Sequence, residues 1–199
     1  MILFIEGCRH SGKTYLISEF IHWAADPRIE YYKFYFANHV QKLDLFHLDR
    51  TSNLHYYSLG NIMTIMEMNV DPRNKDKVWV FDRAIVSAYV WAVLRGRLTE
   101  PDALSEYKRL LDYGLYTNCQ TLRVQVDGQT GDSNRTKDLW DGAHTTSDES
   151  KLMTEFIDAG MPWLRNEAKE NRILEVKNDF NRASIFQFRE ACSTLINNR

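Results

Sequence analysis

The residues with the clearest chemical signature form the run Gly7–Thr14, which reads Gly-Cys-Arg-His-Ser-Gly-Lys-Thr. This run matches the phosphate-binding pattern Gly-x-x-x-x-Gly-Lys-[Ser/Thr] at every fixed position. In such a loop the glycines let the backbone wrap around phosphate oxygens, and the N–H groups at the start of the next helix add partial positive charge. Lys13 would reach the β- and γ-phosphates, and Thr14 would offer its hydroxyl to Mg²⁺. The run therefore predicts a binding site for ATP and Mg²⁺.

Short matches to this pattern also occur by chance, in which case the run would be an ordinary glycine-rich turn. The required context favours the phosphate-binding interpretation, because an apolar strand-like run over 2–6 precedes the loop and a helix-like stretch over 13–25 follows it. The residues that we expect to bind the donor nucleotide are Gly7, Arg9, His10, Ser11, Gly12, Lys13 and Thr14.

A second pair of candidate residues follows the apolar run 78–81, which is typical of a central parallel strand covered on both faces. Because parallel strands present their carboxyl ends at one edge of the sheet, we expect Asp82 to lie beside the phosphate-binding loop. There Asp82 would bind Mg²⁺ or accept the proton of an attacking hydroxyl, and Arg83 would hold phosphate oxygens. The plainer alternative is that Asp82 caps the next helix and Arg83 is solvated.

The polar segment 128–151 is long for a structureless connection, and we expect it to form a lid. Arg135 in this segment would close over the transferring phosphate, stabilise its developing charge and help to exclude water. A solvated surface loop explains the polar composition equally well, since exposed loops are commonly polar.

Hydrophobic patterning predicts the elements that position these residues. Strands are expected at 2–6, 31–37, 78–81, 122–126 and 173–176, and helices at 13–25, 59–68, 84–94, after Pro101, at 150–169 and at 183–196. Strands that alternate with helices predict βαβ units and a parallel sheet. We therefore expect one domain over 1–199 with the α/β P-loop NTPase fold: about five parallel strands flanked by helices, with a lid.

Composition narrows the class of protein. A chain of 199 residues with 44% hydrophobic residues is long enough for one compact core, which argues against disorder. The chain has no apolar run of membrane-spanning length and no signal-peptide pattern, so we expect a cytoplasmic protein without a membrane partner. Three cysteines and six histidines lack paired spacing, which argues against a disulfide framework or an all-protein metal site. The net charge of -2 gives no global reason to bind nucleic acid, although a local basic groove stays open.

Two stretches resemble the thymidylate kinase and deoxynucleoside kinase group of P-loop proteins. Phe-Ile-Glu-Gly at 4–7, followed by Ser-Gly-Lys-Thr at 11–14, is similar to the opening of that group. Val-Phe-Asp-Arg at 80–83, followed by Ser87, resembles the Asp-Arg-Tyr-x-x-Ser stretch of thymidylate kinases, with Ala84 in place of the aromatic residue. The resemblance implies that the 11–14 run serves ATP and Mg²⁺, that the Asp-Arg pair faces the acceptor and its phosphate, and that Ser87 lies near the acceptor pocket.

The chain also departs from that group. Thymidylate kinases carry an acid inside the phosphate loop that touches the acceptor sugar, whereas Arg9 and His10 occupy this region here. They carry a basic signature after the second strand, where this chain has Phe-Ala-Asn-His at 36–39. No arginine matches the clamp for an acceptor monophosphate, and Arg50 and Arg73 are candidates by position only.

The expected activity is Mg²⁺-dependent transfer of the γ-phosphate of ATP to a nucleotide-like acceptor. A deoxynucleoside monophosphate, either thymidylate or a modified pyrimidine, is the favoured acceptor. A free nucleoside is less favoured, because no acid to serve as its base lies between Tyr31 and Lys42. The expected catalytic residues are Lys13, Asp82, Arg83 and Arg135, and the expected Mg²⁺ ligands are Thr14 and Asp82.

Two other functions remain open. A homodimer is also possible as the oligomeric state. Some bacteriophage P-loop kinases phosphorylate hydroxymethyluracil bases in DNA, a reaction that needs a strand-binding groove instead of a monophosphate clamp. The candidates for stacking or phosphate contacts in such a groove are Tyr56, Tyr57, Trp79, Trp91, Trp140, Arg95, Arg97, Lys108 and Arg109. Core packing and solvated faces explain the same residues equally well. The second alternative is a P-loop ATPase or switch module, in which hydrolysis drives a partner protein.

Overall fold

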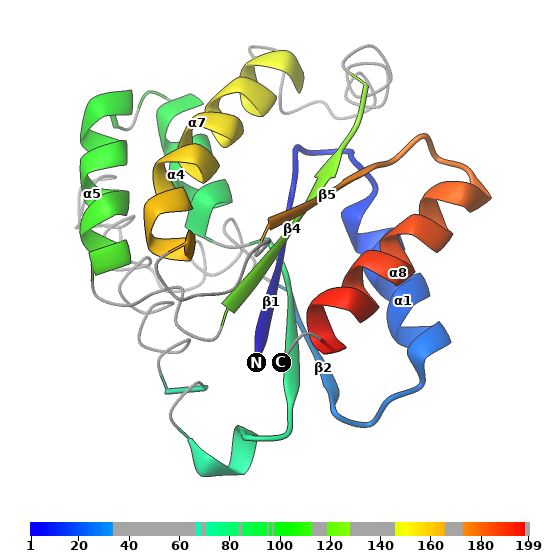
Figure 1. The fold of residues 1–199 in the computed structure, drawn as a ribbon. Helices are drawn as coiled ribbons and strands as arrows, with labels where there is room; N and C mark the ends of the chain where they lie inside the picture. Colours follow the sequence, from blue (N-terminus) through cyan, green and yellow to red (C-terminus); the bar gives the residue numbers. More distant parts are fainter. Residues whose placement is uncertain are drawn as a thin grey trace, which may run out of the picture.

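One five-stranded sheet forms the centre of the protein. The computed structural model describes residues 1–33, 67–68, 71–83, 85–94, 96, 98–112, 119–127, 146–165 and 173–197. The strands are all parallel and lie in the order β2-β3-β1-β4-β5 (Figure 1). Their bounds are β1 Ile2–Glu6, β2 Ile29–Lys33, β3 Val78–Asp82, β4 Cys119–Gln125 and β5 Ile173–Lys177. The expected α/β class and the parallel sheet of five strands are confirmed.

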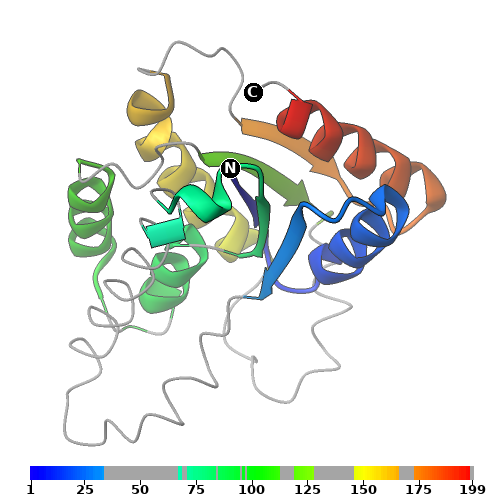
Figure 2. The same cartoon turned by 90° about the horizontal axis from the view of Figure 1, so that it is seen from below.

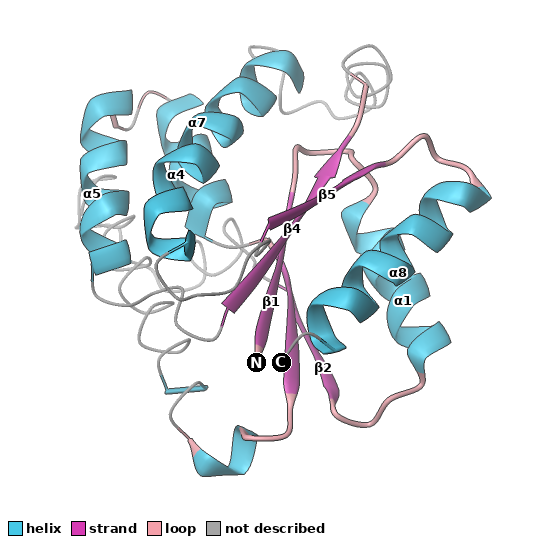
Figure 3. Ribbon diagram, in the orientation of Figure 1, coloured by secondary structure: helices cyan, strands magenta, loops and turns pink. Residues whose placement is uncertain are grey.

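Helices cover both faces of this sheet and make three layers (Figures 2 and 3). One face carries α1 (Lys13–Ala24) and α8 (Arg182–Asn197). The other face carries α4 (Ile85–Leu94), α5 (Glu100–Asp112) and α7 (Thr146–Arg165). A short 3₁₀ turn, η1 (Pro72–Asn74), precedes β3. Among the described helices, none combines the length and the apolar character needed to cross a membrane.

The apolar run of β1 is explained by its central position between the two helical layers. All five of its residues are buried. Because successive side chains of a strand point to opposite faces, Ile2 and Phe4 enter the core beneath α4, α5 and α7, whereas Leu3 and Ile5 enter the core beneath α1 and α8. A parallel strand covered in this way has no polar face, which is why its first four residues, 2–5, are all hydrophobic.

Some sequence-based boundaries differ from the structure; β4, for example, starts at Cys119, three residues before the expected 122–126. The second strand starts at Ile29, two residues before the expected 31–37, because Ile29 pairs with Val78 on β3; residues 34–37 lie outside the described part. Of the expected helix over 59–68, only 67–68 is described, and it is helical. Helix α7 starts at Thr146, four residues before the expected helix over 150–169, so the last residues of the expected lid are helical, and Glu149 is buried there. The rest of the lid, 128–145, including Arg135, lies outside the described residues.

The strand order brings the two predicted site segments to one place. The chain leaves β1 through α1 on one face of the sheet, and it leaves β3 through α4 on the opposite face (Figure 1). Since β1 and β3 are adjacent, their following segments diverge at the carboxyl edge of the sheet. Open α/β sheets commonly bind ligands at such a switch point. The Gly7–Thr14 run and the Asp82–Arg83 pair are the segments that flank it here.

Candidate functional site

The loop between β1 and α1 is glycine-dependent at two positions. Gly7 has a φ of +153° and Gly12 a φ of +77°. A Cβ at Gly7 would lie 2.3 Å from the carbonyl oxygen of Val124, and a Cβ at Gly12 would lie 2.4 Å from Nδ2 of Asn178. The loop is therefore pressed against β4 and against the residues that follow β5, where no side chain fits.

Lys13 is the first residue of α1, and its side chain is buried within the loop. Only 4% of the residue is exposed. Its Nζ donates hydrogen bonds to the carbonyl oxygen of Cys8 and to Oγ of Ser11, the latter at 3.0 Å. Burial, together with the nearby charge of Arg83, lowers the pKa of Lys13 from its ordinary value to about 7. An anion held by the loop would favour the charged form of this amine, since an opposite charge nearby stabilises an ammonium group.

Thr14 and Asp82 meet at the carboxyl edge of the sheet, as expected from the parallel strands. The Thr14 hydroxyl donates to Oδ2 of Asp82 at 2.5 Å, and the Tyr31 hydroxyl donates to the same oxygen at 3.3 Å. These two contacts of Asp82 are with residues of α1 and β2. Because α4 starts at Ile85, Asp82 does not occupy the N-cap position of that helix, which was the plainer alternative. A hydroxyl and a carboxylate oxygen are ligand types that Mg²⁺ accepts, usually together with water and phosphate oxygens. The pair fits such an ion.

Arg83 is held in an unusual conformation directly beside this pair. Its φ is +76°, a left-handed conformation that costs a residue with a side chain of order 1–3 kcal/mol. Its N–H donates to the carbonyl oxygen of Ile5 at 3.0 Å, which ties the strained residue to the central strand. The guanidinium Nη1 lies 3.9 Å from Oε1 of Glu149, and 19% of the side chain is exposed. Arg83 is thus paired, in contrast to the solvated alternative.

Glu6 is a buried acid next to the site that the sequence did not single out as functional. The residue is 1% exposed, and its carboxylate accepts hydrogen bonds from the hydroxyl of Ser87 and, at 3.5 Å, from the N–H of Ser87. Burial raises the pKa of Glu6, while Ser87, Arg83 and Lys13 act in the opposite direction. Ser87, which the resemblance placed near the acceptor pocket, therefore attaches α4 to the end of β1. The sequence feature that could have indicated Glu6 was a glutamate at the end of an otherwise apolar strand.

Glu149 and Asn178 also belong to the site and carried no signal in the sequence. Oε1 of Glu149 accepts the N–H of Arg9 at 2.9 Å. Asn178 follows β5 and is 3% exposed; its Nδ2 donates to the carbonyl oxygen of Ser11 at 2.7 Å. The loop is consequently held by α7 on one side and by the end of β5 on the other.

One other candidate, Arg73, is placed away from the site. Arg73 pairs with Asp71 at 2.7 Å in the turn η1, beyond the amino end of β3 and therefore at the opposite edge of the sheet from Asp82 (Figure 1). Its position excludes it as a clamp for an acceptor at the switch point. Arg50 and Arg135 lie outside the described residues.

Four residues of the postulated DNA surface are described. Trp79 lies near the start of β3, with the ammonium of Lys77 5.2 Å from its ring centroid. Trp91 lies on α4 beneath the guanidinium of Arg9, 4.0 Å from its ring centroid. Lys108 and Arg109 are exposed on α5. The remaining candidates, Tyr56, Tyr57, Arg95, Arg97 and Trp140, lie outside the described part of the chain.

The site is therefore built by the ends of several elements. The start of α1 supplies Lys13 and Thr14, the end of β3 supplies Asp82, and the next residue is Arg83. Within the described residues, no three His, Cys, Asp or Glu side chains gather as a metal site, so an ion here would rely on Thr14, Asp82 and oxygens from ligand and water. No protein-family model matches this chain, and no curated protein matches it.

Proposed function

We propose that this protein is a P-loop phosphotransferase that moves the γ-phosphate of ATP to a nucleotide-like acceptor. The observation that carries the proposal is the contact between the Thr14 hydroxyl and the Asp82 carboxylate. It joins the end of a glycine-dependent loop to the end of the neighbouring strand, which is where open α/β sheets bind ligands. The P-loop NTPase fold is part of this proposal.

The donor phosphates would lie against the Gly7–Thr14 run. The N–H groups of the loop and of the first turn of α1 supply positive potential there, and Lys13 supplies a full charge. Thr14 and Asp82 would hold Mg²⁺ together with phosphate oxygens and water. When bound, that ion neutralises charge that develops on the transferred group.

The acceptor would lie on the α4 and α7 side of the Thr14–Asp82 pair, within reach of Arg83. The guanidinium of Arg83 can bind phosphate oxygens in pairs, which suits a deoxynucleoside monophosphate such as thymidylate or a modified pyrimidine. An oxygen of the acceptor phosphate would form the new bond to the γ-phosphorus as the bond to the bridging oxygen breaks and ADP leaves. Positioning and charge neutralisation are the chief contributions of the protein to such a transfer. In this proposal Arg135 completes the site from the lid.

The first test is ATP turnover with Mg²⁺ over one panel of acceptors: the deoxynucleoside monophosphates, the free nucleosides, and DNA containing thymine or hydroxymethyluracil. Stimulation by one monophosphate is the expected result. Label that enters only the modified DNA would replace the proposed acceptor by a base in DNA. Hydrolysis that ignores every acceptor would support an ATPase or switch module instead.

Two variants test the assignment of the donor site. Lys13→Ala should abolish measurable transfer and weaken ATP binding, because it removes the buried charge of the loop. Asp82→Asn should weaken the dependence on Mg²⁺, because it removes the carboxylate charge. Lys151→Ala is a matched control, since this lysine is 80% exposed on α7. Wild-type turnover in Lys13→Ala, with the fold intact by circular dichroism, would refute the donor assignment.

A further inference from the structure

Glu149 is a carboxylate that joins α7 to both segments of the candidate site. Its side chain is completely buried. One oxygen accepts the backbone N–H of Arg9, in the phosphate-binding loop, at 2.9 Å, and it lies 3.9 Å from the guanidinium of Arg83, after β3. A buried carboxylate is costly unless such partners compensate its lost hydration. The position of Glu149 is therefore coupled to the positions of both partners.

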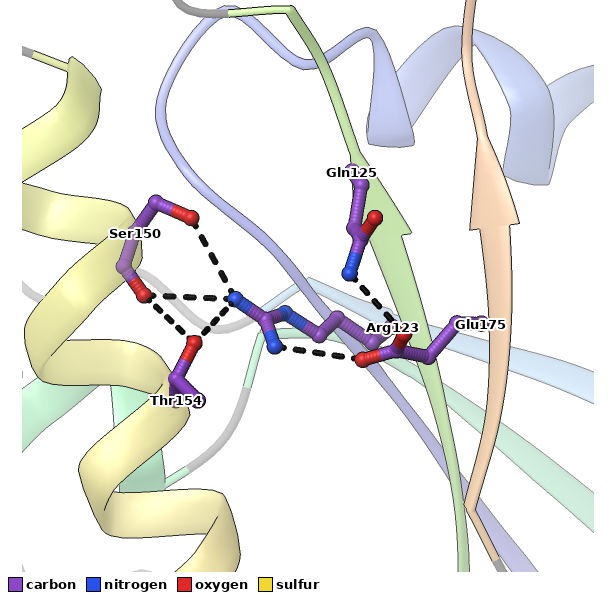
Figure 4. A network of polar contacts seen from close by, with 5 residues as sticks. All are labelled: Arg123, Gln125, Ser150, Thr154 and Glu175. Carbon is purple, nitrogen blue, oxygen red and sulfur yellow. Dashed lines mark hydrogen bonds and ion pairs between the residues drawn. The ribbon is translucent and has the colours of Figure 1, made fainter.

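The turn of α7 that carries Glu149 is itself fastened to the sheet by Arg123 of β4 (Figure 4). Nη2 of Arg123 donates to the carbonyl oxygen of Ser150 at 3.2 Å, to Oγ of Ser150 at 3.3 Å and to Oγ1 of Thr154 at 2.7 Å. Ser150 is the next residue after Glu149, so Arg123 holds the backbone directly beside it.

A carboxylate on the neighbouring strand fixes the other side of Arg123. Its Nη1 donates to Oε1 of Glu175 on β5 at 3.1 Å, and Oε2 of Glu175 accepts the side-chain amide of Gln125 at 2.9 Å (Figure 4). Arg123 is 6% exposed, and its guanidinium lies between these strands and the first turns of α7. A buried guanidinium bonded on both sides has little freedom, so it sets the distance between α7 and the sheet.

We propose that Glu149 is a positioning residue for Arg83 and for Arg9 in the phosphate-binding loop. Arg123 holds Glu149 in place by fixing α7 to the sheet. The part of this proposal that concerns the acceptor rests on the phosphotransferase function given above. Arg83 has a strained backbone, and its guanidinium is 3.9 Å from the Glu149 carboxylate. Loss of that charge should leave the guanidinium less well placed for an acceptor phosphate.

Two substitutions test the roles of Glu149 and of Arg123. Glu149→Gln keeps an oxygen that can accept the Arg9 N–H but removes the charge that faces Arg83. It should raise the KM for the acceptor about tenfold or more and leave ATP binding within about threefold, as expected when one charged contact is lost. Arg123→Met leaves Glu149 in the chain but frees its turn, so it should raise the same KM. If both act through Glu149, the double variant should be no worse than the more impaired single variant.

Asp148→Asn is the matched control, because Asp148 is an exposed acid in the same first turn of α7. It removes the same charge from the helix N-terminus and should leave the KM unchanged. If Arg123→Met does not fold, Arg123→Lys takes its place. Its KM for the acceptor should then lie between the values of the wild type and of Glu149→Gln. Melting temperatures that fall while KM and kcat stay at wild-type values would overturn the proposal, because a purely structural network gives that result.

A second readout does not depend on catalysis. The exchange rate of the Arg9 amide hydrogen, followed by NMR, should rise about tenfold or more in Arg123→Met relative to Asp148→Asn, because the amide loses its ordered acceptor. Unchanged exchange would overturn the coupling between Arg123 and the loop. If exchange responds while the wild-type protein phosphorylates no member of the acceptor panel, the positioning network is supported and the phosphotransferase function is refuted.

Discussion

Replacement of Gly12 by alanine should disturb the loop through one identified contact. Gly12 is left-handed, with a φ of +77°, and an added Cβ would lie 2.4 Å from Nδ2 of Asn178, closer than such atoms approach in proteins. That nitrogen donates to the carbonyl oxygen of Ser11 at 2.7 Å in a buried position. Asn178 must therefore move, and the hydrogen bond that fastens the loop to the end of β5 is lost.

The size of the effect follows from two separate contributions. A left-handed alanine costs about 1–2 kcal/mol, and the more restricted unfolded chain returns about 0.4–1 kcal/mol of this. Leaving the buried carbonyl of Ser11 without its donor costs about 1–3 kcal/mol more. Gly96→Ala is the matched control, because Gly96 has a φ of +61° and no described atom within 4 Å of the added Cβ. Gly12→Ala should therefore lower the free energy of unfolding by about 1–3 kcal/mol more than Gly96→Ala does.

Urea unfolding followed by circular dichroism measures both variants. The combination of Gly12→Ala with Asn178→Ala should cost less than the sum of the single changes, because the second substitution removes the atom that the first one strikes. Equal destabilisation by Gly12→Ala and Gly96→Ala would refute the reasoning. A strictly additive double variant would show that Asn178 is not the neighbour responsible.

Three further predictions each concern a single residue. Burial raises the pKa of the Cys8 thiol from 9.0 to about 11, so its thiolate fraction at pH 8 is about a hundredfold lower than that of an ordinary cysteine. Iodoacetamide should therefore label Cys8 slowly in the native protein and rapidly in urea. Fast labelling of the native protein would contradict this burial. Burial raises the pKa of Glu6, so between the ordinary and the raised pKa the folded state retains a proton that the unfolded state has lost. The free energy of unfolding should therefore fall as the pH rises through this range. Glu6→Gln should flatten this decline in urea titrations at several pH values, while substitution of the exposed Glu190 by glutamine should leave it in place. Arg73→Ala should leave the KM of any acceptor unchanged in steady-state assays, since Arg73 lies at the opposite edge of the sheet; a raised KM would contradict that placement.

The prediction of the fold succeeded where the signal was local. The continuous apolar run of β3 and its aspartate indicated a buried strand and the edge at which it ends, and the adjacency of Asp82 and Thr14 followed from the rule that parallel strands share a carboxyl edge. The start of α7 was missed, because 146–151 is mostly polar and the burial of Glu149 depends on partners far away in the chain. Arg73 was retained as a candidate because its sequence position alone does not say which edge of the sheet it occupies.

The phosphate-loop pattern, the alternation of strands and helices and the candidate pair Asp82–Arg83 can be recognised without a structure, because each is encoded in short stretches of the chain. The buried groups that hold the loop can be identified only from the folded protein. The partners of Arg9 and Ser11 are Glu149 and Asn178, 140 and 167 positions away along the chain. No periodicity or spacing connects such pairs. They are brought together because the sheet places β4 beside β1 and β5 beside β4, so that the segments following these three strands meet around one loop.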